Sequence, residues 1–102
     1  MNPSTTRRLV PTQSSRDYAD HHRTVHADPR VTDLDEDARY IDHISHDNGR
    51  TWQPAGQPTV CGGHVQAEAA SALLRGWDVT ADGTTRTIRH GDGSLTRWTI
   101  TT

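Results

Sequence analysis

One eight-residue stretch, residues 45–52, constrains the backbone more tightly than any other part of the chain. At its centre stands Asn48-Gly49, the dipeptide that most readily adopts the positive φ angles required by a tight turn between antiparallel strands. The carboxylate of Asp47, just before it, is placed to accept hydrogen bonds from backbone N–H groups of the turn. The stretch therefore predicts a β-hairpin, and any fold of this chain has to be built around it.

Five positions of this stretch fit a known pattern. We expect Ser45 and Thr51 to face each other across the two strands as a hydrogen-bonded pair, and Trp52 to cover the loop. Together with Asp47 and Gly49, these residues resemble the Asp-box, the Ser/Thr-x-Asp-x-Gly-x-Thr-Trp/Phe hairpin repeated in sialidases and other propeller proteins. The resemblance implies a structural turn, since the Asp-box of sialidases lies away from their catalytic residues. One copy in 102 residues cannot build a propeller; the alternative is a loop that contacts a ligand.

Composition limits the chain to one domain with a small core. Only 30% of the 102 residues are hydrophobic and the mean hydropathy is −0.86, so part of the chain is expected not to fold. Because there is no Phe, Trp52, Trp77 and Trp98 have to supply much of the buried area. The net charge of −2 gives no general attraction to nucleic acid or anionic lipid. Eleven Arg without a single Lys indicate a GC-rich genome of bacterial or phage origin.

Cysteine content and hydropathy bear on the compartment. The single cysteine, Cys61, cannot form an internal disulfide. No apolar run approaches the length of a signal segment or of a membrane helix. We therefore expect a cytoplasmic protein with no membrane partner.

Residues 1–30 are predicted to form a polar N-terminal arm that is mostly disordered. Its first half, to about residue 14, has too few apolar side chains to offset the entropy of ordering. From Ser15 to His26 the pattern is weakly helical, and such a helix would dock through Tyr18 and Val25 or fray.

Residues 31–102 are predicted to form a single small α+β domain. Its clearest helix is Val65 to Leu74, which is rich in alanine and followed by Gly76. Three short strands separated by glycine turns follow it as a meander: Trp77 to Thr80, Thr85 to His90 and Leu95 to Thr101. The hairpin either extends this sheet or packs beside it.

The segment before the hairpin is less clearly patterned. Asp33 and Glu36 have the spacing of a capping box, so a helical turn and an acidic linker fit equally well. Tyr40 to Ile44 is predicted as the first strand of the hairpin, and Pro54 should end its return strand because proline cannot donate to a ladder.

Alternation predicts which side chains of the meander share a face. The side expected to receive the helix carries Trp77, Val79, Ile88, Trp98 and Ile100. The outward side carries Asp78 and Leu95, together with a candidate binding face of five residues that has Arg86 near it: Arg75, Thr87, Arg89, Arg97 and Thr99. Neighbouring arginines suit bidentate contacts with carboxylates or phosphates. The alternative is a solvated face on which threonine supports the strands and arginine protects the edge.

Several histidines have spacings that resemble small metal sites. The candidate zinc ligands are His43, His46, Cys61 and His64. His43 and His46 are three residues apart around a strand and its turn, so their side chains are expected to point to different sides. Surface histidines and a loop cysteine are the favoured interpretation, also for His21-His22 with His26. We predict no metal and no cofactor.

One further resemblance concerns catalysis. Asp42-His43-Ile44 is similar to the Asp-His-Ile of HNH nucleases, in which the histidine is a general base and a later asparagine and histidine help to bind metal. The expected asparagine is missing from the helix that follows. We therefore predict no catalytic residues.

These patterns favour a small non-catalytic interaction or adaptor protein. It would bind a protein partner, which the sequence does not identify, through the sheet face or through the Trp52 hairpin. The alternative is a nucleic-acid-binding module that uses the arginines of the sheet, and a small hydrolase or nuclease comes third.

Overall fold

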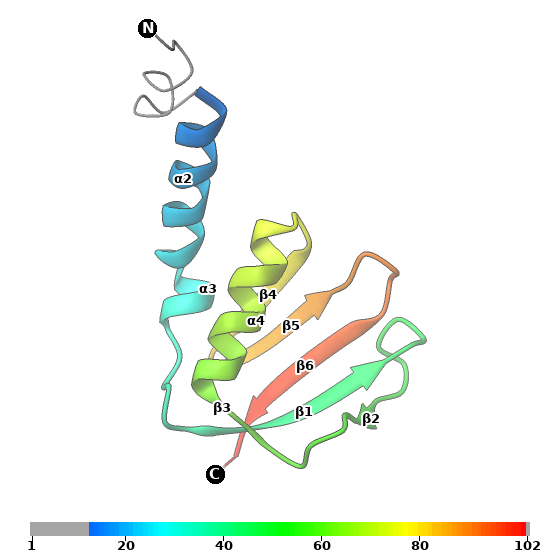
Figure 1. Ribbon diagram of the computed structural model, residues 1–102. Helices are drawn as coiled ribbons and strands as arrows, with labels where there is room; N and C mark the ends of the chain where they lie inside the picture. Colours follow the sequence, from blue (N-terminus) through cyan, green and yellow to red (C-terminus); the bar gives the residue numbers. More distant parts are fainter. Residues whose placement is uncertain (1–12, 102) are drawn as a thin grey trace, which may run out of the picture.

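The computed structural model describes the backbone of residues 13–101, and the first twelve residues of the predicted disordered arm lie outside this range. The fold is α+β, as predicted: one helix lies across a face of a six-stranded antiparallel sheet, and two helices that come earlier in the chain pack beside that helix, the first of them extending beyond the sheet (Figure 1). The helices are α2 (Gln13–His26), α3 (Pro29–Thr32) and α4 (Gly62–Leu74). The strands are β1 (Arg39–Ser45), β2 (Gln53–Pro54), β3 (Val60–Cys61), β4 (Asp78–Asp82), β5 (Thr85–Arg89) and β6 (Leu95–Ile100).

The hairpin and the meander belong to one sheet. The strand order is β2-β1-β6-β5-β4, and β3 pairs with the other end of β1. The junction is the long antiparallel pairing of β1 with β6, which runs from Tyr40 opposite Ile100 to Ser45 opposite Leu95. Of the two arrangements that the sequence left open, the hairpin therefore extends the sheet, and β1 becomes an inner strand.

The return strand of the hairpin is short and ends at Pro54, as predicted. Pro54 is the last residue of β2 and is paired with His43. Proline is tolerated here because β2 is an edge strand, on which a missing N–H group breaks no second ladder. The next residue restores the pairing, since the N–H of Ala55 donates to the carbonyl of Asp42 at 2.9 Å.

The helix α4 begins at Gly62, earlier than the predicted Val65, because this glycine lets the helix pack against the segment before β1. A Cβ on Gly62 would overlap the carbonyl oxygen of Asp35, so only glycine fits there. The N–H of Gly62 donates to Ala38 at 2.9 Å. At the other end Gly76 has φ +78°, as expected for the residue that ends a helix.

The helix predicted at Ser15 to His26 is confirmed by α2, which contacts α4 through its C-terminal end. Val25 is buried in the core, whereas Tyr18 is 66% exposed and does not dock. The short α3 follows at once, because the Asp28 carboxylate accepts the N–H of Arg30 at 2.9 Å and caps it. The predicted capping box at Asp33 is not observed, since Asp33 follows the end of α3.

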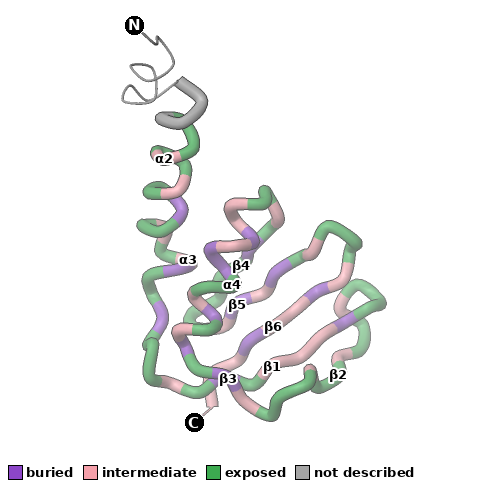
Figure 2. The backbone as a smooth tube through the Cα atoms, in the orientation of Figure 1, coloured by how far each residue is buried: buried purple, intermediate pink, exposed green. Residues whose placement is uncertain are grey.

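The core lies between the sheet and α4, and the predicted alternation of the meander holds on this inner face (Figure 2). Its largest contributions from the sheet are Tyr40, Ile88 and Trp98, with Val79 beside them. Alanines of α4 pack against these side chains, and small residues let the helix lie close to the strands.

Arg86 corrects the sequence analysis, which placed it near the exposed arginines. It points to the inner face, and only 1% of its surface is exposed. Its guanidinium donates to five backbone carbonyls, those of Pro29, Arg30, Asp33, Gly83 and Thr85, at 2.5–3.4 Å. Three of these carbonyls belong to α3 and its C-terminal end, so this side chain ties α3 to β5.

Candidate functional site

The loop of residues 45–52 is held by a hydrogen-bond network centred on Asp47. Its carboxylate accepts the backbone N–H of Thr51 at 2.8 Å, the Thr51 hydroxyl at 2.5 Å and the Ser45 hydroxyl at 2.9 Å. The Ser45 hydroxyl in turn accepts the N–H of Gly49 at 2.9 Å. Asn48 and Gly49 have φ angles of +62° and +87°, as predicted for this turn.

Two consequences follow for the chemistry of the loop. Ser45 and Thr51 are not bonded to each other, because both bind the Asp47 carboxylate that lies between them. Hydrogen bonds from the Thr51 hydroxyl and N–H, with a further contribution from Ser45, lower the pKa of Asp47 to about 2. The carboxylate is therefore ionised and fully engaged within the loop. Its role in this geometry is to hold the turn.

Trp52, the last residue of this loop, covers part of the outer face of the sheet, which is the face away from α4. Its indole ring stacks on Arg97, whose Cζ lies 4.0 Å from the ring centroid. A Cβ built on Gly49 would lie 3.5 Å from Leu95 and 3.7 Å from the Trp52 ring, so the loop packs directly on both. Leu95 faces outward as predicted but is buried under this contact.

The outer face brings together four of the five residues of the candidate binding face. One row across the strands contains Thr80, Thr87, Arg97, His43 and Pro54. Thr99 lies opposite Ile41 on one side of this row, and Arg89 lies opposite both Leu95 and Asp78 on the other. No helix covers this face in the part of the chain that the structure describes (Figure 1).

Arg75 is the member that the structure separates from the rest. It follows α4 in the helical layer, and its Cζ lies 5.0 Å from the ring centroid of Trp77, a residue of the inner side. Alternation could not place Arg75, because it lies between a helix and a strand and not within the meander.

The arginines of the outer face differ in what they contact. Arg39 donates to the Thr59 hydroxyl at 3.1 Å, and Arg89 stands opposite Asp78. Arg97 has no hydrogen bond or ion pair with any described side chain, and its buried Nε is without an acceptor. The Nδ1 of the neighbouring His43 also lacks a hydrogen-bond partner. Arg97 and His43 therefore keep polar groups that nothing in residues 13–101 satisfies.

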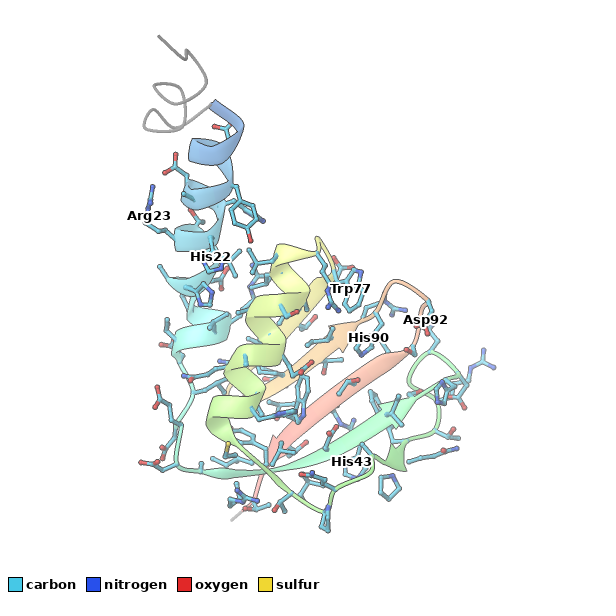
Figure 3. All side chains as sticks on the ribbon, viewed as in Figure 1. His22, Arg23, His43, Trp77, His90 and Asp92 are labelled. Carbon is cyan, nitrogen blue, oxygen red and sulfur yellow. The ribbon has the colours of Figure 1, made fainter. Side chains whose placement is uncertain are left out.

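The four candidate zinc ligands are dispersed over several elements. His43 lies on the outer side of β1 beside β2 (Figure 3), and His46 lies in the hairpin loop. His64 belongs to α4 and meets Trp98 of the inner face edge-on, with ring centroids 6.4 Å apart. Cys61 is exposed at the end of β3. Within the described residues no three His, Cys, Asp or Glu side chains form a metal-binding group.

Asp42 is the one carboxylate of the sheet's inner face. Burial raises its pKa, while His64 and the Trp98 indole act in the opposite direction. Its Oδ1 and the Trp98 Nε1 have no hydrogen-bond partner among the described residues. His43, the base in the HNH resemblance, points to the opposite face, so the two residues cannot act on one substrate.

Two hollows lie on the helical side of the molecule. A cleft of about 420 Å³ has Ile44 and Thr96 in its lining, with Trp77, His90 and Asp92 at the end of the sheet (Figure 3). The rings of Trp77 and His90 meet edge-on at 5.1 Å, and His90 Nε2 lies 2.6 Å from the Thr96 hydroxyl. A second hollow of about 350 Å³ lies among α2, α3 and the N-terminal end of α4.

Sequence reasoning missed the stack of Trp52 on Arg97 and the cleft beside Trp77. Alternation along the strand places Arg97 on the outer face, which was a signal for the stack. The contact between Trp52 and Arg97 also depends on the pairing of β1 with β6. For the cleft the sequence carries no comparable pattern.

Among the described residues, no helix is both long and apolar enough to cross a membrane. Comparisons of the chain with protein-family models, curated proteins and solved structures found no match.

Proposed function

We propose that this chain is a small non-catalytic interaction protein that binds a protein partner through the outer face of its sheet. The observation that carries the proposal is the stack of Arg97 on Trp52 at the centre of an uncovered face. Tryptophan and arginine are the side chains most enriched at the energetic centres of protein interfaces. Here they are already held in position by the 45–52 loop, so little ordering entropy would be lost on binding.

The surroundings of this pair support a protein partner. Ile41, which is 36% exposed, and Pro54 supply apolar surface on the same face. Threonines on three strands supply uncharged polar groups around them. A mixed apolar and polar rim around an aromatic and arginine centre is the usual composition of a protein interface.

A nucleic-acid-binding module is the second candidate, favoured by the presence of Arg39, Arg89 and Arg97 on one face. Two observations weigh against it. Asp78 and Asp82 lie on the same face along β4, and the chain as a whole carries a net charge of −2. A phosphate backbone needs several uncompensated cations in line.

A hydrolase or nuclease has the least support. His43 and Asp42 face opposite sides of the sheet, and the carboxylate of Asp47 is engaged within its own loop. We further propose that residues 45–52 are an Asp-box with a structural role, that the protein acts in the cytoplasm, and that it needs no cofactor.

The test is a pull-down from native lysate, with and without nuclease, using the double variant Arg89→Ala with Arg97→Ala. The variant should lose its partner while its stability changes by less than about 1 kcal/mol, because Arg89 is exposed and the half-buried Arg97 makes no hydrogen bond or ion pair within the described chain. Arg75→Ala is the matched control, since this exposed arginine lies in the other layer. Capture unaffected by the double variant would contradict the proposal, and capture abolished by nuclease would favour nucleic acid.

A further inference from the structure

We propose that Arg97 and His43 form a receptor for one carboxylate presented by an acidic side chain of the protein partner. This inference rests on the proposed function and names the chemistry that the outer face recognises. The cleft beside Trp77 and the Asp42–His64 pair offer weaker cases. Neither contains a charged side chain that is both unpaired and held in position by an aromatic ring, as Arg97 is.

The orientation of Arg97 is the first step of the argument. The Cζ of Arg97 lies 4.0 Å from the centroid of the Trp52 ring, so this ring holds the guanidinium in place. A guanidinium held by one face leaves its N–H edge for a partner, and that edge matches the two oxygens of a carboxylate. Its Nε is buried without an acceptor, so the contact with a partner falls to the two terminal NH₂ groups, which reach the surface and have no hydrogen-bond partner among the described residues. A guanidinium that is unpaired and partly removed from water gains from an incoming anion.

His43 is the second group of the receptor. It stands directly opposite Arg97 in the β1–β6 ladder, so the two side chains project from the same face at neighbouring positions. Its Nδ1 is buried, whereas its Nε2 reaches the surface without a hydrogen-bond partner among the described residues. In the tautomer protonated at Nε2, or in the imidazolium form, Nε2 donates, and it can then meet the second lone pair of a carboxylate held by Arg97.

The charge pattern of the face selects a single carboxylate over a polyanion. Arg39 is bonded to Thr59, and Arg89 stands opposite the acidic Asp78, whereas Arg97 stands between His43 and Thr87 and faces no carboxylate across the strands. Asp78 and Asp82 occupy β4 on the same face. A chain of phosphates laid along the sheet would meet these carboxylates, whereas one acidic side chain centred on Arg97 avoids them.

The experiment is an NMR titration of the full chain at constant ionic strength. The probe is N-acetylglutamate α-methylamide, which carries one carboxylate, and its matched control is the uncharged glutamine analogue. The carboxylate probe should shift the Arg97 Nε–H, the Trp52 indole and the His43 ring resonances along one saturable curve. The glutamine analogue should leave them unchanged, and oligodeoxythymidylate should bind no more tightly per site than the carboxylate probe.

Two lysine variants sharpen the result. Arg97→Lys keeps the charge but loses the planar stack and the second donor, so affinity for the probe should fall at least about tenfold. Arg75→Lys, in the helical layer, should leave it unchanged. Shifts that spread over all arginines without saturating, or equal effects of the two lysine variants, would overturn the proposal. If the titration fails while the double alanine variant still loses its partner, the outer face binds protein by other chemistry and only this inference falls.

Discussion

Two arginines on adjacent strands of the same sheet illustrate how differently this fold uses one residue type. Arg86 of β5 points to the inner face and satisfies its guanidinium with five backbone carbonyls. Arg97 of β6 points to the outer face, where it stacks on an indole ring and has no hydrogen-bond or ion-pair partner among the described side chains. The first arginine is a structural tie, since its bonding capacity is used up within the chain. The second keeps that capacity for something outside the chain.

The largest effect is expected from breaking the inner tie. Arg86→Met keeps much of the buried volume but removes the hydrogen bonds to five carbonyls, so it should destabilise the fold by about 3–5 kcal/mol. Chemical denaturation of the two proteins measures the difference. Arg86→Lys should lose less, because an ammonium retains the charge and part of the bonding. A Met variant as stable as the parent would show that Arg86 does not hold α3 to the sheet.

A second substitution tests the packing of α4 against the segment before β1. Gly62→Ala places a methyl group where the carbonyl of Asp35 lies, so either the segment or the helix has to shift. Overpacking of this kind costs about 1–3 kcal/mol. Gly56→Ala is the control, because a Cβ there meets no atom within 4 Å. Equal denaturation midpoints for the two variants would contradict the close approach.

How much of this the sequence could predict depends on how local each feature is. The turn at Asn48-Gly49 and the end of α4 at Gly76 follow from the backbone needs of single residues, and both were predicted. The outward position of Arg97 followed from alternation within one strand. The same alternation puts Arg86 inward with Ile88, yet the general rarity of buried arginine made an exposed position the more natural expectation.

The site itself depends on contacts between segments far apart in the chain. Trp52 reaches Arg97 because β1 pairs with β6, and nothing in the hairpin or the meander specifies that pairing by itself. The five carbonyls that bind Arg86 come from α3, from its C-terminal end and from the β4–β5 turn, and this convergence exists only once the layers have packed. Such features are properties of the assembled sheet, so sequence patterns predicted the elements but not the receptor.

The loop that positions Trp52 provides the next test of the comparison. Asp47→Ala removes the acceptor of the Thr51 N–H and hydroxyl, so it should lower the melting temperature and broaden the Trp52 indole resonance. Arg50→Ala, in the same loop, should change neither. Equal effects of the two substitutions would mean that Asp47 does not organise the loop.

The same carboxylate gives a pH dependence with a defined sign. The pKa of Asp47 in the folded protein is about 2, below its ordinary value of about 3.9 in an unfolded chain. Its contribution to stability is therefore complete above about pH 4 and is lost as the pH falls toward 2. Melting curves across this range should converge for the parent and Asp47→Ala. Asp28 has a similarly low pKa because it is bonded to Arg30, so the parent should lose further stability in the same window.

The smallest effect on folding is expected at Arg97, which completes the comparison with Arg86. Arg97→Ala removes a stack on Trp52 but no hydrogen bond, so the loss of stability should be about 0.5–1 kcal/mol. The loss should also vary little with salt, because no ion pair is removed. Binding, by contrast, should respond strongly to this change, since the guanidinium is the group offered to the partner. A substitution that is nearly neutral for folding and severe for capture is the behaviour of a residue kept for recognition. If Arg97→Ala unfolded the domain as readily as Arg86→Met, both arginines would be structural, and the outer face would lose the residue on which its proposed function depends.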